Sequence, residues 1–183
     1  YIGNGVVIDP GVLMQELENL NKAGIKPDLG ISERAHITFD FHKALDELEE
    51  EFKGGLRAGT TKRGVGPTYS DKAARFGIRV VDLLDEDALR RKLDVLFELK
   101  QRIITQVYHG KTGLNKEEIL ERTLEFGRKI SGYICDVSIE VNSALDKGQT
   151  VIFEGAQGTL LDIDHGVYPY GTSSNAIAGG ACT

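Results

Sequence analysis

Hydrophobic residues recur at helical spacing through the middle of the chain. The pattern predicts a long amphipathic helix over residues 85–108, a second helix after Asn115, and a third over residues 133–146. Asn115 is a residue type that caps helix starts, and Gly148 is typical of a helix end. We therefore expect a mostly helical subdomain over about residues 85–147.

Short apolar runs on either side of these helices predict strands. Residues 6–8 lead into Asp9-Pro10, which suits the cap and first residue of a helix. Residues 36–41 alternate well enough for a strand, and residues 42–52 then follow a helical pattern. Residues 151–153 are apolar and predict a buried strand. Strands separated by helices indicate an α/β fold with a mainly parallel central sheet, in a single domain over residues 1–183.

The composition narrows the class of protein. The chain has 22 Lys and Arg against 28 Asp and Glu, and its net charge of −6 argues against a nucleic-acid binder with a basic face. No apolar run approaches the ~20 residues of a membrane-spanning helix. Cys135 and Cys182 are too few for a disulfide framework, so we expect a cytoplasmic protein. The first residue is Tyr1 rather than Met, and we expect an incomplete chain.

Residues 59–75, GTTKRGVGPTYSDKAAR, form a polar, basic stretch in this acidic chain. It is not a P-loop, because Gly64 is followed by Val65-Gly66 instead of Lys-Ser or Lys-Thr. The pattern predicts a flexible loop whose hydroxyl, N–H and cationic donors suit a phosphate or carboxylate. A basic surface loop without a ligand is the alternative.

A second polar stretch follows the predicted strand at residues 151–153. Ligands of open α/β sheets bind in the loops after strands, and Gln157 in such a loop can donate and accept hydrogen bonds. The hydroxyl-rich residues 172–175 precede a small-residue segment, where free N–H groups favour an anion. A capped surface turn without a ligand is the alternative.

Two groups of residues raise the question of a metal site. His36 and His42 lack the spacing of a metal-binding pair. Asp162 and Asp164 would share one face of a strand, with His165 following. We expect structural roles for all five and nominate no metal ligand.

Three stretches together closely resemble adenylosuccinate synthetases. They are IGNGVVIDP at residues 2–10, residues 59–79, and residues 153–175, which begin FEGAQGTLLDIDHG. Their order and spacing also match, so the resemblance covers essentially the whole chain. It implies a partial P-loop-NTPase-like fold and a ligase of purine and AMP biosynthesis, which joins inosine monophosphate (IMP) to L-aspartate using GTP and Mg²⁺. The γ-phosphoryl group of GTP would first move to the purine 6-oxygen, and the amine of aspartate would then displace that phosphate.

The resemblance implies four IMP-binding residues. Thr61 and Thr172 match threonines that bind the IMP 5′-phosphate, and Gln157 matches a glutamine near the purine 6-oxygen. Arg75 matches an arginine that reaches the IMP phosphate of the neighbouring subunit, which implies a homodimer. Gly171 stands where the family usually has a larger apolar residue, which leaves the position of the Thr172 hydroxyl open.

Other family motifs have no counterpart in these residues. The family's glycine-rich phosphate loop, catalytic Asp and catalytic His precede GNGVV, and its guanine- and aspartate-binding regions follow TSSN. We therefore nominate no catalytic residue, expect GTP and Mg²⁺ to bind through segments outside this chain, and expect the chain alone to be inactive. Arg63 and Lys72 lie in a family motif without an assigned role. The alternative is a non-catalytic nucleotide-binding or interaction fragment.

Overall fold

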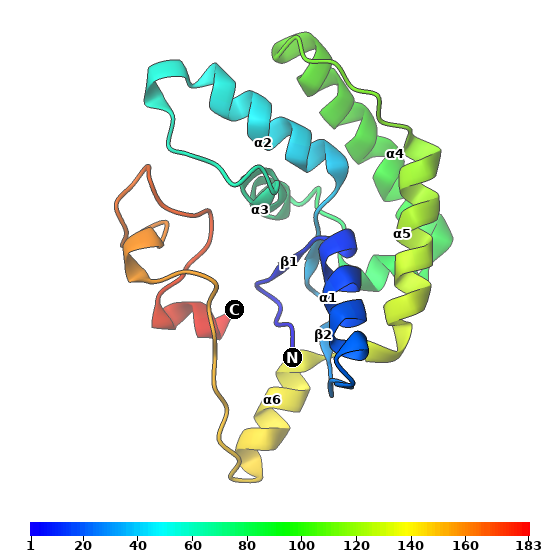
Figure 1. The fold of residues 1–183 in the computed structure, drawn as a ribbon, viewed down its shortest axis with the longest axis vertical. Coiled ribbons are helices and arrows are strands. Elements are labelled where there is room, and N and C mark those ends of the chain that lie inside the picture. Colours follow the sequence, from blue (N-terminus) through cyan, green and yellow to red (C-terminus); the bar gives the residue numbers. More distant parts are fainter.

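The computed structural model describes residues 1–183 as six α-helices with four short strands (Figure 1). The helices are α1 (Pro10–Lys22), α2 (Asp40–Phe52), α3 (Val65–Ala74), α4 (Glu86–Arg102), α5 (Lys116–Ile130) and α6 (Val137–Asp146). The strands are β1 (Val7–Ile8), β2 (Ile31–Ser32), β3 (His36–Ile37) and β4 (Ile134–Cys135). Short 3₁₀ turns and one π-helical turn connect these elements. No helix has both the length and the apolar character needed to span a membrane.

The strands pair in parallel. β1 lies beside β3, with Val7 opposite His36, and β2 lies beside β4, with Ile31 opposite Ile134. Each parallel partner is reached through a helical crossover, as parallel pairing requires. The predicted α/β class with parallel strands is confirmed, and the pairing is divided between two two-stranded sheets.

Two helix starts and one helix end follow the predicted signals. The Asp9 carboxylate accepts hydrogen bonds from the N–H groups of Gly11 (2.9 Å) and Val12 (3.3 Å), so it caps α1 with Pro10 in the first turn. Asn115 caps α5 in the same way. Gly148 follows α6 with φ of 71°, a conformation that glycine adopts without a Cβ penalty.

The predicted strand over residues 36–41 is wrong beyond Ile37. The ring of His42 accepts a hydrogen bond from the Phe39 N–H at 2.9 Å, so this group has a partner without a neighbouring strand. The chain therefore turns into α2 at Asp40, two residues before the predicted helix start.

Two predicted helices are shorter than expected. The helix predicted over residues 85–108 is α-helical only to Arg102, after which residues 103–107 form a π-helical turn. The helix predicted from residue 133 begins at Val137, because Ile134–Cys135 pairs with β2 and Asp136 then caps α6. The pattern of apolar residues does not register such pairing with a distant strand.

The predicted flexible loop over residues 59–75 is wrong from Val65 onward, where α3 begins. Gly64 adopts φ of 74° ahead of the helix, and its N–H donates to the Asp46 carboxylate at 2.9 Å. A Cβ on Gly64 would lie 2.8 Å from the backbone of His42, so only glycine fits here. The Thr68 hydroxyl then donates to the Gly64 carbonyl at 2.7 Å and closes the first turn.

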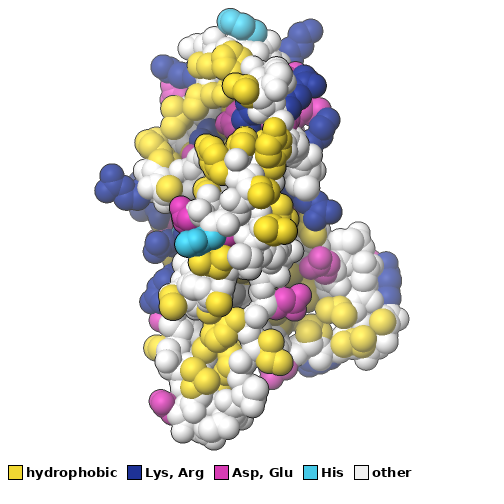
Figure 2. All heavy atoms as spheres, turned by 90° about the vertical axis from the view of Figure 1, so that its left-hand side faces the viewer, with side chains coloured by type: hydrophobic (Ala, Val, Ile, Leu, Met, Phe, Trp, Pro, Cys, Tyr) yellow, Lys and Arg dark blue, Asp and Glu magenta, His cyan; other side chains and the backbone are white.

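The predicted buried strand over residues 151–153 is also wrong. Ile152 and Phe153 are 86% and 58% exposed, and no strand of the chain lies beside them to accept their N–H groups. Residues 151–183 contain one buried residue, Asp162. Figure 2 shows hydrophobic side chains on the face that includes this segment.

The hydrophobic core lies between the other elements. Phe41 and Leu45 of α2 pack with Leu89, Leu93 and Leu96 of α4 in one buried cluster of 20 residues. α4 also packs against α5, and the two helices lie side by side in Figure 1. Helices α4–α6 thus occupy the region of the predicted helical subdomain, and their forming a subdomain stays a prediction.

Candidate functional site

Segments that are distant in sequence meet around Asn4. The Asn4 amide donates to the Thr183 carbonyl (3.0 Å) and the Ser138 hydroxyl (3.1 Å), and its oxygen accepts from the Ser32 hydroxyl (2.5 Å). From α3, the Lys72 ammonium donates to the Asn4 carbonyl at 3.4 Å. Both chain ends accordingly lie near the centre of the molecule in Figure 1.

Helix α3 lies against both other motif stretches. The Tyr69 hydroxyl donates to the Gly5 carbonyl at 2.6 Å, and burial raises the pKa of this tyrosine. A Cβ on Gly66 would lie 3.3 Å from the Ser173 hydroxyl, so the first turn of α3 faces residues 172–175. The fold thus brings the three motif stretches together at α3.

The region around α3 carries unpaired positive charge. Five Lys and Arg side chains lie between residues 59 and 79, and only Lys62 has a salt-bridge partner, the carboxylate of Glu47 at 2.6 Å. The other four are Arg63, Lys72, Arg75 and Arg79. Burial, with the nearby Arg79 charge, lowers the pKa of Lys72. Cations left unpaired in an acidic chain are well suited to bind a phosphate or carboxylate.

The four sequence-predicted site residues are exposed or half-buried, at the ends of α3 and in the loops of residues 151–183. Thr61 is exposed three residues before Gly64, and Thr172 is half-buried in the turn that faces the start of α3. Gln157 is exposed in a loop that contacts Ala176. The side chains of these three residues make no hydrogen bond within the chain, and neither does that of Arg75. All four side chains are therefore available to a ligand.

Arg75 lies at the opposite end of α3 from Thr61 and Thr172. It is exposed, caps the last turn, and has a left-handed backbone with φ of 66°. The ten residues of α3 separate the two ends by about 15 Å. The structure therefore brings the two threonine-bearing segments to one end of α3 and does not bring Arg75 to them.

The turn that carries Thr172 is tightly packed. The Thr172 N–H donates to the Leu161 carbonyl at 2.7 Å. A Cβ on Gly171 would lie 2.8 Å from the same carbonyl oxygen, so a larger residue at this position requires Leu161 to move. Gly171 therefore allows a close turn that holds the backbone of Thr172 in place.

Asp162 and Asp164 serve this turn rather than a strand face. The fully buried Asp162 carboxylate accepts from the N–H groups of Asp164 (2.9 Å), His165 (3.0 Å) and Ile177 (3.2 Å). Burial raises the pKa of Asp162, but these donors outweigh it and hold the pKa below its usual value. Asp164 accepts from the Asn175 amide at 2.8 Å. No group of three or more His, Cys, Asp or Glu side chains is arranged to hold a metal ion.

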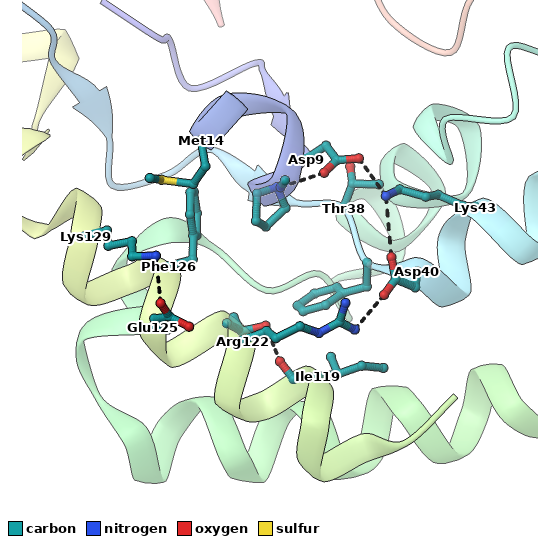
Figure 3. A pocket seen from close by; sticks show the side chains of 14 residues that line it. Asp9, Met14, Thr38, Asp40, Lys43, Ile119, Arg122, Glu125, Phe126 and Lys129 are labelled. Carbon is teal, nitrogen blue, oxygen red and sulfur yellow. Dashed lines mark hydrogen bonds and ion pairs between the residues drawn. The ribbon is translucent and has the colours of Figure 1, made fainter. Parts of the chain in front are cut away.

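A cavity of about 280 Å³ lies elsewhere, between α1, α2 and α5 (Figure 3). Its charged side chains are already paired: Lys43 contacts Asp9 (2.8 Å) and Asp40 (3.5 Å), and Asp40 contacts Arg122 (2.7 Å). None of the sequence-predicted site residues lines it. The paired charges leave no free cation for an anionic ligand in this cavity.

Sequence reasoning missed Asn4 and Tyr69, which join the motif stretches through hydrogen bonds. Each lies within one of the family motifs, and this was the one sequence signal that could have marked it as a candidate site residue. Their partners, Thr183 and Gly5, are separated from them by 179 and 64 residues. No pattern of apolar spacing connects residues so far apart.

Comparison with known proteins gives consistent matches over the chain. A family model described as adenylosuccinate synthetase matches residues 1–183. An adenylosuccinate synthetase of Acetivibrio thermocellus is 51% identical over 183 residues, covering 100% of this chain and 43% of that protein. One of Lactobacillus helveticus is 53% identical over 183 residues, covering 100% of this chain and 42% of that protein. The chain therefore spans less than half the length of these relatives.

The fold matches a solved structure as well. The structure of fully ligated adenylosuccinate synthetase from Plasmodium falciparum superposes with a TM-score of 0.85 at 36% sequence identity. The match covers 97% of this chain and 41% of that one. The mixed α/β fold with parallel strands is thus shared with this longer protein.

Proposed function

Because the chain belongs to the adenylosuccinate synthetase family, we propose that it supplies part of the IMP pocket and dimer interface of a GTP-dependent ligase. The enzyme would act in purine biosynthesis in the cytoplasm and form adenylosuccinate from IMP and L-aspartate. The observation that carries the proposal is the set of four unpaired cations around α3, where the three motif stretches meet.

The proposed reaction has two stages. A base outside this chain removes the proton from N1 of the purine, and the 6-oxygen attacks the γ-phosphorus of GTP as GDP leaves. The amine of aspartate then attacks C6, and inorganic phosphate leaves with the 6-oxygen. The Gln157 amide would donate a hydrogen bond to the 6-oxygen and stabilise the charge that develops there.

The IMP phosphate would be held by groups that are free in this chain. The hydroxyls of Thr61 and Thr172 lie in segments at one end of α3 and have no internal partner. Arg75 lies about 15 Å away at the other end, which suits the phosphate of a neighbouring subunit in a homodimer. A guanidinium can make two parallel hydrogen bonds to one phosphate.

GTP and Mg²⁺ would bind through other parts of the enzyme. The relatives are more than twice the length of this chain, and no carboxylate cluster here fits a Mg²⁺ ion. When bound, Mg²⁺ would neutralise charge on the transferring phosphoryl group. We therefore expect the 183-residue chain to bind IMP weakly and to form no product by itself.

Calorimetric titration of IMP into the protein of the relatives' full length tests this function. We expect Arg75→Ala to weaken IMP binding about 10- to 100-fold, since charge-assisted hydrogen bonds contribute about 1.5–3 kcal/mol. Arg91→Ala is the matched control, because Arg91 is also exposed and has no salt-bridge partner. Unchanged IMP affinity of Arg75→Ala in a confirmed dimer would contradict the shared-site assignment.

A further inference from the structure

Three charged or polar side chains from three helices meet in the core. The Asp71 carboxylate of α3 lies 2.9 Å from Nε2 of His42 in α2 and accepts a second hydrogen bond from the Lys100 ammonium of α4. Asp71 is 3% exposed, His42 1% and Lys100 7%. His42 and Lys100 each lie 29 residues from Asp71 in sequence, so the contact depends on the tertiary fold.

The hydrogen bonds define the protonation state of this cluster. The Phe39 N–H donates to Nδ1 of His42 at 2.9 Å, so that nitrogen carries no proton and Nε2–H donates to Asp71. Burial lowers the pKa of His42, so the imidazole is neutral. Burial raises the pKa of Asp71, but its hydrogen bonds from His42 and Lys100 outweigh this and hold it below the usual range. The cluster is one buried ion pair with a neutral imidazole.

A buried ion pair is weak evidence for a net gain in stability. Removing two charges from water costs several kcal/mol each, and well-packed apolar residues often replace a buried pair without loss. What the cluster supplies is a defined geometry. Asp71 has donors on both carboxylate oxygens, one from α2 and one from α4, so α3 cannot rotate or slide without breaking one of them.

The main chain of Asp71 organises the turn that carries Arg75. Its carbonyl accepts from the N–H groups of Phe76 (2.9 Å) and Gly77 (3.1 Å), and these bonds enclose Arg75. Gly77 is pressed against the ring of His36, where a Cβ would lie 2.5 Å from a ring carbon. The side chain of Asp71 thus fixes α3 in the core, while its carbonyl fixes the turn at the surface.

We propose that Asp71, held by His42 and Lys100, is the positioning residue that directs the Arg75 guanidinium toward the IMP phosphate. The inference rests on the proposed function of Arg75 and adds the residues that orient it. A residue that acts only through Arg75 has no effect once Arg75 is absent. This property separates positioning from a general contribution to stability.

A double-mutant cycle on the full-length protein tests the proposal. We expect Asp71→Asn to raise the KM for IMP about tenfold with kcat changed less than about twofold, because ground-state and transition-state binding weaken together. In the Arg75→Ala background the same substitution should change KM less than about twofold. Lys100→Met, which removes one of the two donors, should act in the same direction and serves if Asp71→Asn does not fold.

Thr123→Val provides the control for lost stability. Thr123 is buried and its hydroxyl donates to the Ile119 carbonyl at 2.6 Å, in α5 and away from α3. This variant should destabilise the fold and leave the KM for IMP unchanged.

Each outcome of the cycle has one meaning. Equal effects of Asp71→Asn with and without Arg75, or an unchanged KM, would overturn the positioning role while the loss in Arg75→Ala still supports the proposed function. An unchanged KM in Arg75→Ala itself would overturn both.

Discussion

Arg75 combines an unpaired, exposed side chain with a backbone φ of 66°. Helices commonly end in this left-handed conformation with glycine, because other L-residues place Cβ too close to the backbone. A backbone in this region persists where the surrounding structure holds it, and such residues cluster at functional sites. Arginine at this position is therefore explained by its side chain and not by the turn.

The conformation of Arg75 predicts that substitution by glycine and by alanine differ in stability but not in IMP binding. We expect Arg75→Gly to be about 1 kcal/mol more stable to unfolding than Arg75→Ala, because only the alanine keeps the Cβ that disfavours left-handed φ. Both variants should lose the same IMP affinity, since both lack the guanidinium. Urea denaturation and IMP titration measure the two quantities. Equal stability of the two variants would show that this turn relaxes out of the left-handed conformation.

His36 makes folding stability depend on pH. It is 4% exposed, its Nδ1 has no hydrogen-bond partner, and burial together with the Lys72 and Arg79 charges lowers its pKa from 6.5 to about 4. Between pH 6.5 and pH 4 the unfolded chain therefore binds a proton on His36 that the folded chain does not bind. The His36 contribution to stability is full above pH 6.5 and decreases as the pH falls toward 4.

Urea unfolding at pH 7 and pH 5 tests this assignment. We expect the wild-type chain to lose about 1–2 kcal/mol more than His36→Asn over this interval, because the unfolded chain binds a proton on His36 near pH 6.5 and the folded chain only near pH 4. His42 is also buried with a lowered pKa, and it contributes equally to both proteins, so the difference isolates His36. Parallel pH dependence in the two proteins would exclude His36 as the source.

At the level of elements, local signals predicted the starts of α1 and α5 correctly. Asp9 and Asn115 cap α1 and α5 because their side chains bond to N–H groups only two or three residues away. Such contacts are contained in a short stretch of sequence. The start of α3 was missed because its determinant, the packing of Gly64 on the backbone of His42, joins residues that are distant in sequence.

Contacts between residues distant in sequence also limited the prediction of the strands and of the candidate site. Residues 151–153 have the composition of a strand, but a strand forms only where a partner accepts its N–H groups. Motif resemblance nominated Thr61, Arg75, Gln157 and Thr172 by position alone, and their role in binding stays a prediction. It did not identify the cluster around Asp71, because a lysine at position 100 reads as a solvent-facing helix residue until the fold buries it.

At the level of the whole molecule, the hydrophobic core buries its apolar side chains, whereas the segment of residues 151–183 exposes most of its own. All 20 residues of the main hydrophobic cluster lie between Ile8 and Ile130. Residues 151–183 instead expose large apolar side chains, namely Ile152, Phe153, Leu160, Leu161, Ile163, Val167, Tyr168 and Tyr170. Relatives more than twice as long match this chain, so in a protein of that length we expect further residues to cover this segment.

Amide hydrogen exchange of residues 151–158 can be compared between the 183-residue chain and the full-length protein. In the 183-residue chain no N–H group of residues 151–158 donates a hydrogen bond, so these amides should exchange at nearly the unprotected rate. Amides around Leu93 in α4 are buried in the core and should exchange slowly in both proteins. In the full-length protein, pairing with a further strand should slow exchange at residues 151–153 by about 100-fold or more. Unprotected exchange there in both proteins would mean that this apolar run forms no strand even when its neighbours are present, and that the loop of Gln157 is not supported by a sheet.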